Sequence, residues 1–170
     1  MKPAAPVTPL QSSREDIRIA YLAALAIVIH VAEAALPSPL PGIKPGLANI
    51  ITIAVLCRFG WSAAAWVSVL RILAGSLLIG TFLSPSFFLS FSGATASLAV
   101  LAPAARLPGI GPVGLSVLAS LGHMAAQFAA AYMLFIPHPA MLGLLPILMS
   151  AALGFGVING LIARSMLGKR

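Results

Sequence analysis

Six long apolar segments, separated by proline, glycine or charged residues, dominate the pattern along the chain. They cover residues 17–36, 46–59, 61–80, 86–105, 113–136 and 140–163. Five of them hold about 20 residues or more, which is the length that a helix needs to cross a hydrocarbon core about 30 Å thick. The second is shorter and is expected to be tilted or partly recessed. Because the runs are long and do not alternate with a period of two, the pattern predicts an all-α bundle of six transmembrane helices.

Composition leads to the same class of protein. Hydrophobic residues make up 60% of the 170 residues and charged residues only 8%, and the mean hydropathy is +1.05. A soluble domain of this length usually carries about a quarter charged residues, because its surface must face water. We therefore expect the chain to lie in a lipid bilayer as a single domain over residues 17–164, with a cytoplasmic tail at 1–16 and a basic tail at 165–170.

The distribution of positive charge predicts the orientation. One side of the six segments carries Lys2, Arg14, Arg18, Arg58, Arg106, Arg164, Lys169 and Arg170. The other side carries only Lys44, and Arg71 lies within a segment. Cationic loops stay in the cytoplasm, so both termini are expected there. This bias and contact with anionic lipid account for the net charge of +7 without nucleic-acid binding, and the chain has no basic stripe with interleaved aromatic residues.

The sequence offers little for autonomous catalysis. Its three acidic residues are Glu15, Asp16 and Glu33, whereas Mg²⁺-diphosphate chemistry normally uses clusters of carboxylates to hold the metal ions. Cys57 is the only cysteine, which excludes a disulfide or a thiolate metal site within one chain. We expect no enzyme activity, no bound metal and no cofactor.

Polar residues within the apolar segments are the candidates for function, because burying them in lipid is costly. The proposed substrate-binding residues are Glu33, Lys44, Asn49, Arg71, His123 and Gln127. Arg71 lies ten residues into its segment, about 15 Å from the cytoplasmic end. Two interpretations remain open and are compatible. Arg71 pairs with Glu33 in a sealed network, or it faces a cavity open to the outside that receives an anionic or carbonyl-bearing solute.

Two further features each have a structural and a functional interpretation. Four prolines within residues 35–50 stiffen the connection around Lys44, which makes it either a rigid turn or a lid over the cavity. Small residues recur at a spacing of four, as in Ala20 and Ala24 or Gly156 and Gly160. Such ridges serve packing within the bundle or docking onto a partner, and Ala20 with Ala24 is the best docking candidate.

Three stretches also resemble a known family. They are PSPLPGIKPGLANI at residues 37–50, LRILAGSLLIGTFLSPSF at 70–87, and HMAAQ at 123–127. They look like the Gx transporter family, often labelled heptaprenyl diphosphate synthase component I, and the resemblance covers roughly residues 18–165. Its members are small bacterial inner-membrane proteins similar to the S components of energy-coupling factor transporters.

The resemblance carries its own implications. S components have six helices and bind a micronutrient near the outer face under the loop between helices 1 and 2. They dock through small residues of helix 1 onto a transmembrane coupling protein driven by two ATPases. It thus implies that Lys44 and Asn49 belong to the lid and rim, that Arg71 is a cation in the cavity, and that Ala20 and Ala24 form the docking ridge. The alternative is a noncatalytic membrane partner of a polyprenyl diphosphate synthase, and a third possibility is a purely structural subunit.

Overall fold

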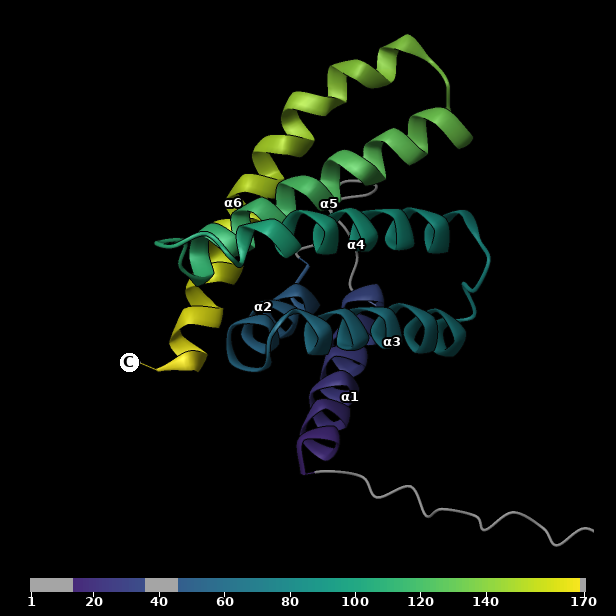
Figure 1. The fold of residues 1–170 in the computed structure, drawn as a ribbon. Coiled ribbons are helices and arrows are strands. Elements are labelled where there is room, and N and C mark those ends of the chain that lie inside the picture. The colour runs from purple at the N-terminus through teal and green to yellow at the C-terminus, as the bar shows by residue number, and fades with distance from the viewer. Residues whose placement is uncertain (1–13, 36–45, 169–170) are drawn as a thin grey trace, which may run out of the picture.

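The computed structural model describes residues 14–35 and 46–168. Every regular element in these ranges is a helix. In chain order they are α1 (Arg14–Ala35), α2 (Ala48–Phe59), α3 (Trp61–Ile79), α4 (Pro85–Ala104), α5 (Pro112–Leu134), the 3₁₀-helix η1 (Pro139–Leu144) and α6 (Leu145–Leu167). The prediction of an all-α protein is confirmed for the described residues, and Figure 1 shows α3 and α4 running across the bundle, with α1 and α6 at steep angles to them.

Five of the helical segments are long and apolar enough to cross a membrane, and α2 is a shorter apolar helix, as the sequence predicts. The last segment begins differently from the prediction. Its first residues form η1, and α6 starts at Leu145, with Pro146 in its first turn, where a missing amide costs no hydrogen bond. At its other end α6 continues to Leu167, three residues beyond the predicted limit of the membrane domain at 164.

The short helix α2 lies at the centre of the bundle. It packs against α1, α3, α5 and α6. Its buried apolar residues point in all directions around the helix and are Ile50, Ile51, Ile53, Val55 and Leu56. A helix of 12 residues is about 18 Å long and cannot span the hydrocarbon core. Because other helices surround α2, it forms the core that the longer helices cover.

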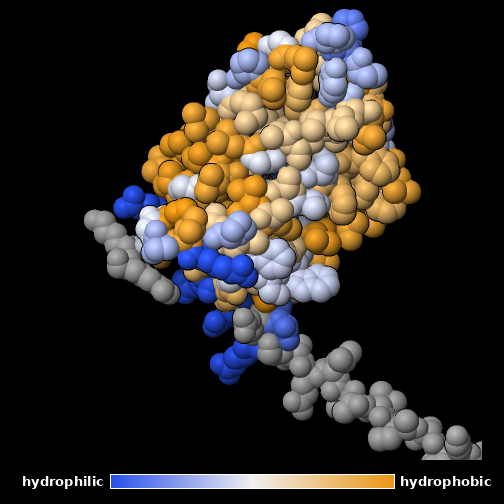
Figure 2. All heavy atoms as spheres, turned by 45° about the horizontal axis from the view of Figure 1, so that its top comes forward, coloured by the Kyte–Doolittle hydropathy of each residue, from blue (hydrophilic) through white to orange (hydrophobic). Residues whose placement is uncertain are grey.

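The outer surface of the bundle is apolar. Large hydrophobic side chains such as Val28, Trp66, Leu78, Met133 and Leu161 are exposed on four different helices. Figure 2 shows hydrophobic atoms over most of the visible face, with hydrophilic atoms gathered toward opposite ends. A surface of this kind is stable in lipid rather than in water. Together with the helix lengths, it indicates a multi-pass membrane protein in contact with the bilayer.

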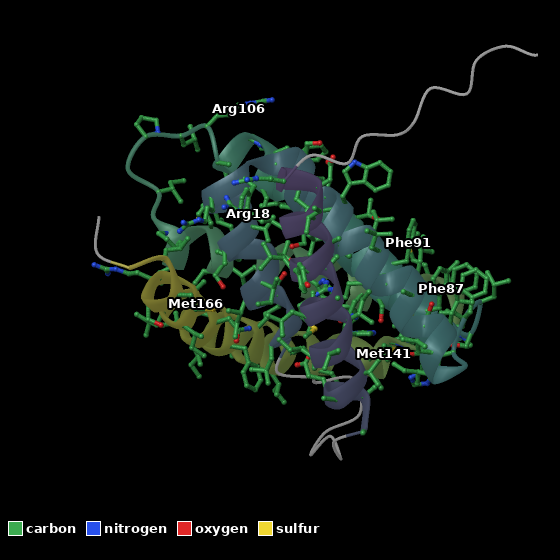
Figure 3. All side chains as sticks on the ribbon, turned by 90° about the horizontal axis from the view of Figure 1, so that it is seen from below. Arg18, Phe87, Phe91, Arg106, Met141 and Met166 are labelled. Carbon is green, nitrogen blue, oxygen red and sulfur yellow. The ribbon has the colours of Figure 1, made fainter. Side chains whose placement is uncertain are left out.

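The described arginines outside α3 all lie at one end of the bundle, which we call the basic end. At this end α1, α3 and α5 begin and α2, α4 and α6 end, and it carries Arg14, Arg18, Arg58, Arg106 and Arg164. Figure 3 shows Arg18, Arg106 and Met166 toward one end of the bundle and Phe87 and Met141 toward the other. The segregation of charge seen in the sequence is therefore a property of the fold.

The ridges of small residues differ in what they contact. A methyl group added at Gly160 would lie 2.6 Å from the Cα atom of Val113, and one at Gly156 would lie 2.9 Å from the Cα atom of Val117. These glycines let α5 and α6 approach closely, which is the packing interpretation. Ala20 and Ala24 are exposed on α1 and serve no packing within the described bundle.

Candidate functional site

The carboxylate of Glu33 joins the end of α1 to the beginning of α2. Glu33 is buried, and its Oε1 atom accepts a hydrogen bond of 2.6 Å from the backbone N–H of Leu47. Leu47 precedes the first turn of α2, where backbone amides have no partner within the helix. The side chain therefore satisfies a helix start in the interior, and it fixes α1 to α2 at the end of the bundle opposite the basic end.

Arg71 lies in α3 within the protein interior. Only 6% of its surface is exposed, and it interacts electrostatically with Glu33. Among the described residues its buried Nε atom has no hydrogen-bond partner. A guanidinium carries five N–H donors and no acceptor, and an unsatisfied buried donor costs free energy. The structure thus brings Arg71 and Glu33 together, while leaving a donor of Arg71 available to a further group.

His123 and Gln127 bring α5 and α4 into the same cluster. His123 interacts electrostatically with Arg71 and forms a hydrogen bond with the backbone of Gly93. A methyl group added at Gly93 would lie 2.7 Å from His123 Nε2 and 2.8 Å from Gln127 Cγ. Gly93 is therefore the space in α4 that accommodates both side chains, as glycine does wherever another group approaches the backbone closely.

Of the remaining predicted site residues, Asn49 lies at the start of α2. Asn49 is half-buried in the first turn, and its backbone N–H donates to the carbonyl of Gly46. Lys44 lies outside the described residues. The side chain of Asn159 in α6, which the sequence interpretation missed, is buried and donates from Nδ2 to the same Gly46 carbonyl at 3.2 Å. The signal in the sequence is that Asn159 is an isolated amide within the apolar segment 140–163.

A small hydroxyl-lined cavity lies between α1, α3 and α4, and its lining includes Ala34 and Ile72, which follow Glu33 and Arg71 in the chain. Its volume is about 30 Å³, and its lining includes His30, Ser76, Thr81, Ser86 and Ser90. Gly75 accommodates the His30 ring, since an added methyl group would lie 2.6 Å from its Cδ2 atom. A space of this size holds about one water molecule. Arg71 itself is buried and does not line this cavity, so the Arg71 cluster is closed in the described structure.

The chemistry of the cluster is that of recognition. Arg71 offers N–H donors to a carboxylate, phosphate or carbonyl oxygen, and His123 and Gln127 provide groups able to orient such a molecule. The described residues contain no group of three or more His, Cys, Asp or Glu side chains that could hold a metal ion. Asp16 and Glu33, on the same helix, are separated by 17 positions, which corresponds to about 25 Å.

A known protein family matches this chain over nearly its whole length. Residues 22–166 match the profile of the family described as heptaprenyl diphosphate synthase component I. The match includes all three stretches on which the resemblance in the sequence rests. No curated protein and no solved structure matches the chain. The protein therefore belongs to the heptaprenyl diphosphate synthase component I family.

Proposed function

We propose that this membrane protein binds a small organic solute in the interior of the bundle and takes part in its uptake. The observation that carries the proposal is Arg71, a guanidinium buried in a membrane protein whose Nε has no hydrogen-bond partner among the described residues. Charged groups inside a membrane protein usually face a partner, a cavity or a transport pathway. An anionic or carbonyl-bearing solute would supply the missing acceptor.

The same residues suggest how the site opens. Glu33 holds the start of α2 through Leu47, and Asn159 holds the adjacent Gly46 carbonyl from α6. A solute that attracts Arg71 would compete with Glu33 for the guanidinium. Release of these two contacts at the start of α2 would then widen the closed cluster. Lys44 and Asn49, next to this point in the sequence, would contribute to the rim, as the resemblance implies.

The proposed environment is the inner membrane, with the basic end in the cytoplasm and the polar cluster reached from outside. The exposed small residues Ala20 and Ala24 lie on a largely apolar face of α1 that also includes Tyr21 and Val28. This face is the proposed docking surface for a transmembrane coupling protein with ATPase subunits. Close approach of helix backbones at such small residues is a common mode of association in lipid.

The proposal is tested by the small molecules that the protein retains. Wild-type protein and the Arg71→Gln variant are purified in parallel, and mass spectrometry identifies the polar solutes released from each. We expect a solute in the wild-type sample that is at least tenfold depleted in Arg71→Gln, because a hydrogen bond to a charged group contributes about 1.5–3 kcal/mol. Arg106→Gln, at the basic end, is the matched control. Equal amounts of every solute in all three samples would refute the proposal.

A second candidate is a noncatalytic subunit of a polyprenyl diphosphate synthase, which the family description favours. Among the described side chains, Asp16 and Glu33 lie at opposite ends of α1 and so form no carboxylate pair for the metal ions of prenyl transfer. Its contribution would then be to anchor or activate a catalytic chain. If addition of this protein raises the prenyl transferase activity of a catalytic chain and no solute is retained, the second candidate replaces the first.

A further inference from the structure

A cavity lies at the basic end, and none of the Arg71 cluster residues is among its lining residues. Its volume is about 650 Å³, within the range of small-molecule sites. Three helices contribute to its lining, which is formed by Cys57, Arg58, Pro112, Leu161, Arg164, Ser165, Leu167 and Gly168. The residues thus come from the last turn of α2, the first turn of α5 and the end of α6.

Positive charge converges on this cavity from two side chains. Arg58 and Arg164 are both exposed, and each is in the last turn of its helix. Guanidinium groups bind phosphate oxygens through pairs of parallel hydrogen bonds, which gives both strength and orientation. Among the described residues, no acidic side chain contributes to the lining.

The beginning of α5 adds to the positive potential. Pro112 is the first residue of this 23-residue helix and lines the cavity, and no side chain caps the helix at this end. The first backbone N–H groups of a helix lack partners within the helix, and its dipole places about half a positive charge there. An anion near Pro112 would meet these donors as well as the two arginines.

The opposite wall of the cavity is apolar. Leu161 and Leu167 of α6 line it, and Leu161 is 52% exposed. A free inorganic anion would gain no contact with this apolar wall, whereas an amphiphile would pack its apolar chain against it. We therefore propose that the basic-end cavity binds a phosphate group carried on an apolar chain, with the phosphate between Arg58 and Arg164. This inference concerns a second site and does not depend on the proposed uptake function.

Lipid retention tests the assignment. The purified protein is mixed in a neutral detergent with equal amounts of phosphatidylglycerol and phosphatidylcholine, and native mass spectrometry counts the lipids that remain bound. We expect at least tenfold preference for phosphatidylglycerol, which the double variant Arg58→Gln with Arg164→Gln loses. Arg106→Gln removes a charge from the same end but outside the cavity and should keep the preference. An unchanged preference in the double variant, or an equal loss in Arg106→Gln, would overturn the proposal.

A second measurement uses the wild-type chain alone and does not depend on how the variants fold. Cys57 is exposed in the lining and is the only cysteine in the sequence. Phosphatidylglycerol, but not phosphatidylcholine, should slow its modification by N-ethylmaleimide. Inorganic pyrophosphate is tested in parallel. Protection by phosphatidylglycerol, with or without protection by pyrophosphate, supports the site, whereas protection by pyrophosphate alone or by neither compound contradicts it.

Discussion

Two arginine sites of this protein differ in almost every physical respect. Arg71 lies in the middle of α3, buried beside Glu33 and His123, and the nearby hydroxyl-lined cavity holds about 30 Å³. Arg58 and Arg164 lie at helix ends, exposed around a cavity of about 650 Å³. The first site is closed and has a counter-charge, whereas the second is open and has no counter-charge among the described residues of its lining.

This difference separates two uses of the same side chain in a membrane protein. A buried guanidinium needs compensation in every state of the molecule, so a ligand can bind Arg71 only by replacing or joining groups already present. Exposed arginines at the end of a bundle are solvated and cost nothing to maintain. They attract an anion when a cavity gives it additional contacts. We therefore expect conformational change to control the first site and concentration of ligand to control the second.

The largest expected effect is a difference in chemical access between the two regions. Cys57 lines the open cavity, whereas Ser76 is buried and lines the hydroxyl-lined cavity. We expect N-ethylmaleimide to modify wild-type Cys57 at least tenfold faster than the introduced thiol of a Cys57→Ser, Ser76→Cys variant, because the latter must await local opening. The rates are measured as the mass increase of the intact protein.

Two controls determine what this comparison means. Cys57→Ser alone should not react, which shows that the thiol observed is the intended one. Ser76→Cys must also elute as wild-type protein does on size exclusion, since Ser76 donates a hydrogen bond to the carbonyl of Leu73. Equal rates at the two thiols would mean that the Arg71 region is open in solution, and the contrast between the sites would disappear.

A smaller effect is expected where α5 and α6 form the wall of the basic-end cavity. Gly160→Ala places a methyl group 2.6 Å from the Cα atom of Val113, so the helices must separate. We expect a loss of about 1–3 kcal/mol in the free energy of unfolding, as for other overpacked contacts. Gly154→Ala on the same helix has open space and should instead gain a few tenths to 1 kcal/mol. Thermal unfolding of both variants measures the difference, and equal stabilities would contradict the close approach of α5 and α6.

The sequence predicted the closed region far better than the open one. A charge within an apolar segment is rare, so Arg71 and Glu33 could be selected without knowledge of the fold, and the structure brings them together. Arg58 and Arg164 were recognised only as topological charges. Their shared cavity depends on how α2, α5 and α6 pack, and no local pattern joins positions separated by more than a hundred residues.

The limits of the segments show a similar division. Hydrophobic runs predicted six segments and the short second helix, because lipid imposes a length and a composition on whatever crosses it. They did not predict the start of α6, since Leu142 and Leu144 of η1 are as apolar as the helix that follows. Pro146 was the local signal for that start. Hydrophobicity alone also could not predict that α2 would be the central helix.

In the closed region, two variants of Glu33 separate the effect of its hydrogen bond to Leu47 from the effect of its charge near Arg71. Glu33→Ala removes the acceptor for the Leu47 amide and should cost about 1–3 kcal/mol in the free energy of unfolding. Glu33→Gln keeps an oxygen acceptor for the Leu47 amide and loses only the negative charge near Arg71, so it should cost less than Glu33→Ala, which loses both. Chemical or thermal unfolding of the two variants gives the comparison. If both lose the same stability, the charge rather than the contact with α2 holds this region closed.

The smallest expected change in stability concerns Gly93, the position in α4 that accommodates His123 and Gln127. Gly93→Ala would place a methyl group 2.7 Å from His123 Nε2, but the nearby atoms belong to side chains that can move. The gain of about 0.5–1 kcal/mol from replacing glycine within a helix should offset much of that strain. We expect the free energy of unfolding to change by less than about 1 kcal/mol while the retained solute decreases, because the displaced His123 interacts with Arg71. The free energy of unfolding and the amount of retained solute are measured for the same variant. If Gly93 serves only packing, Gly93→Ala will lower the free energy of unfolding and leave the retained solute unchanged.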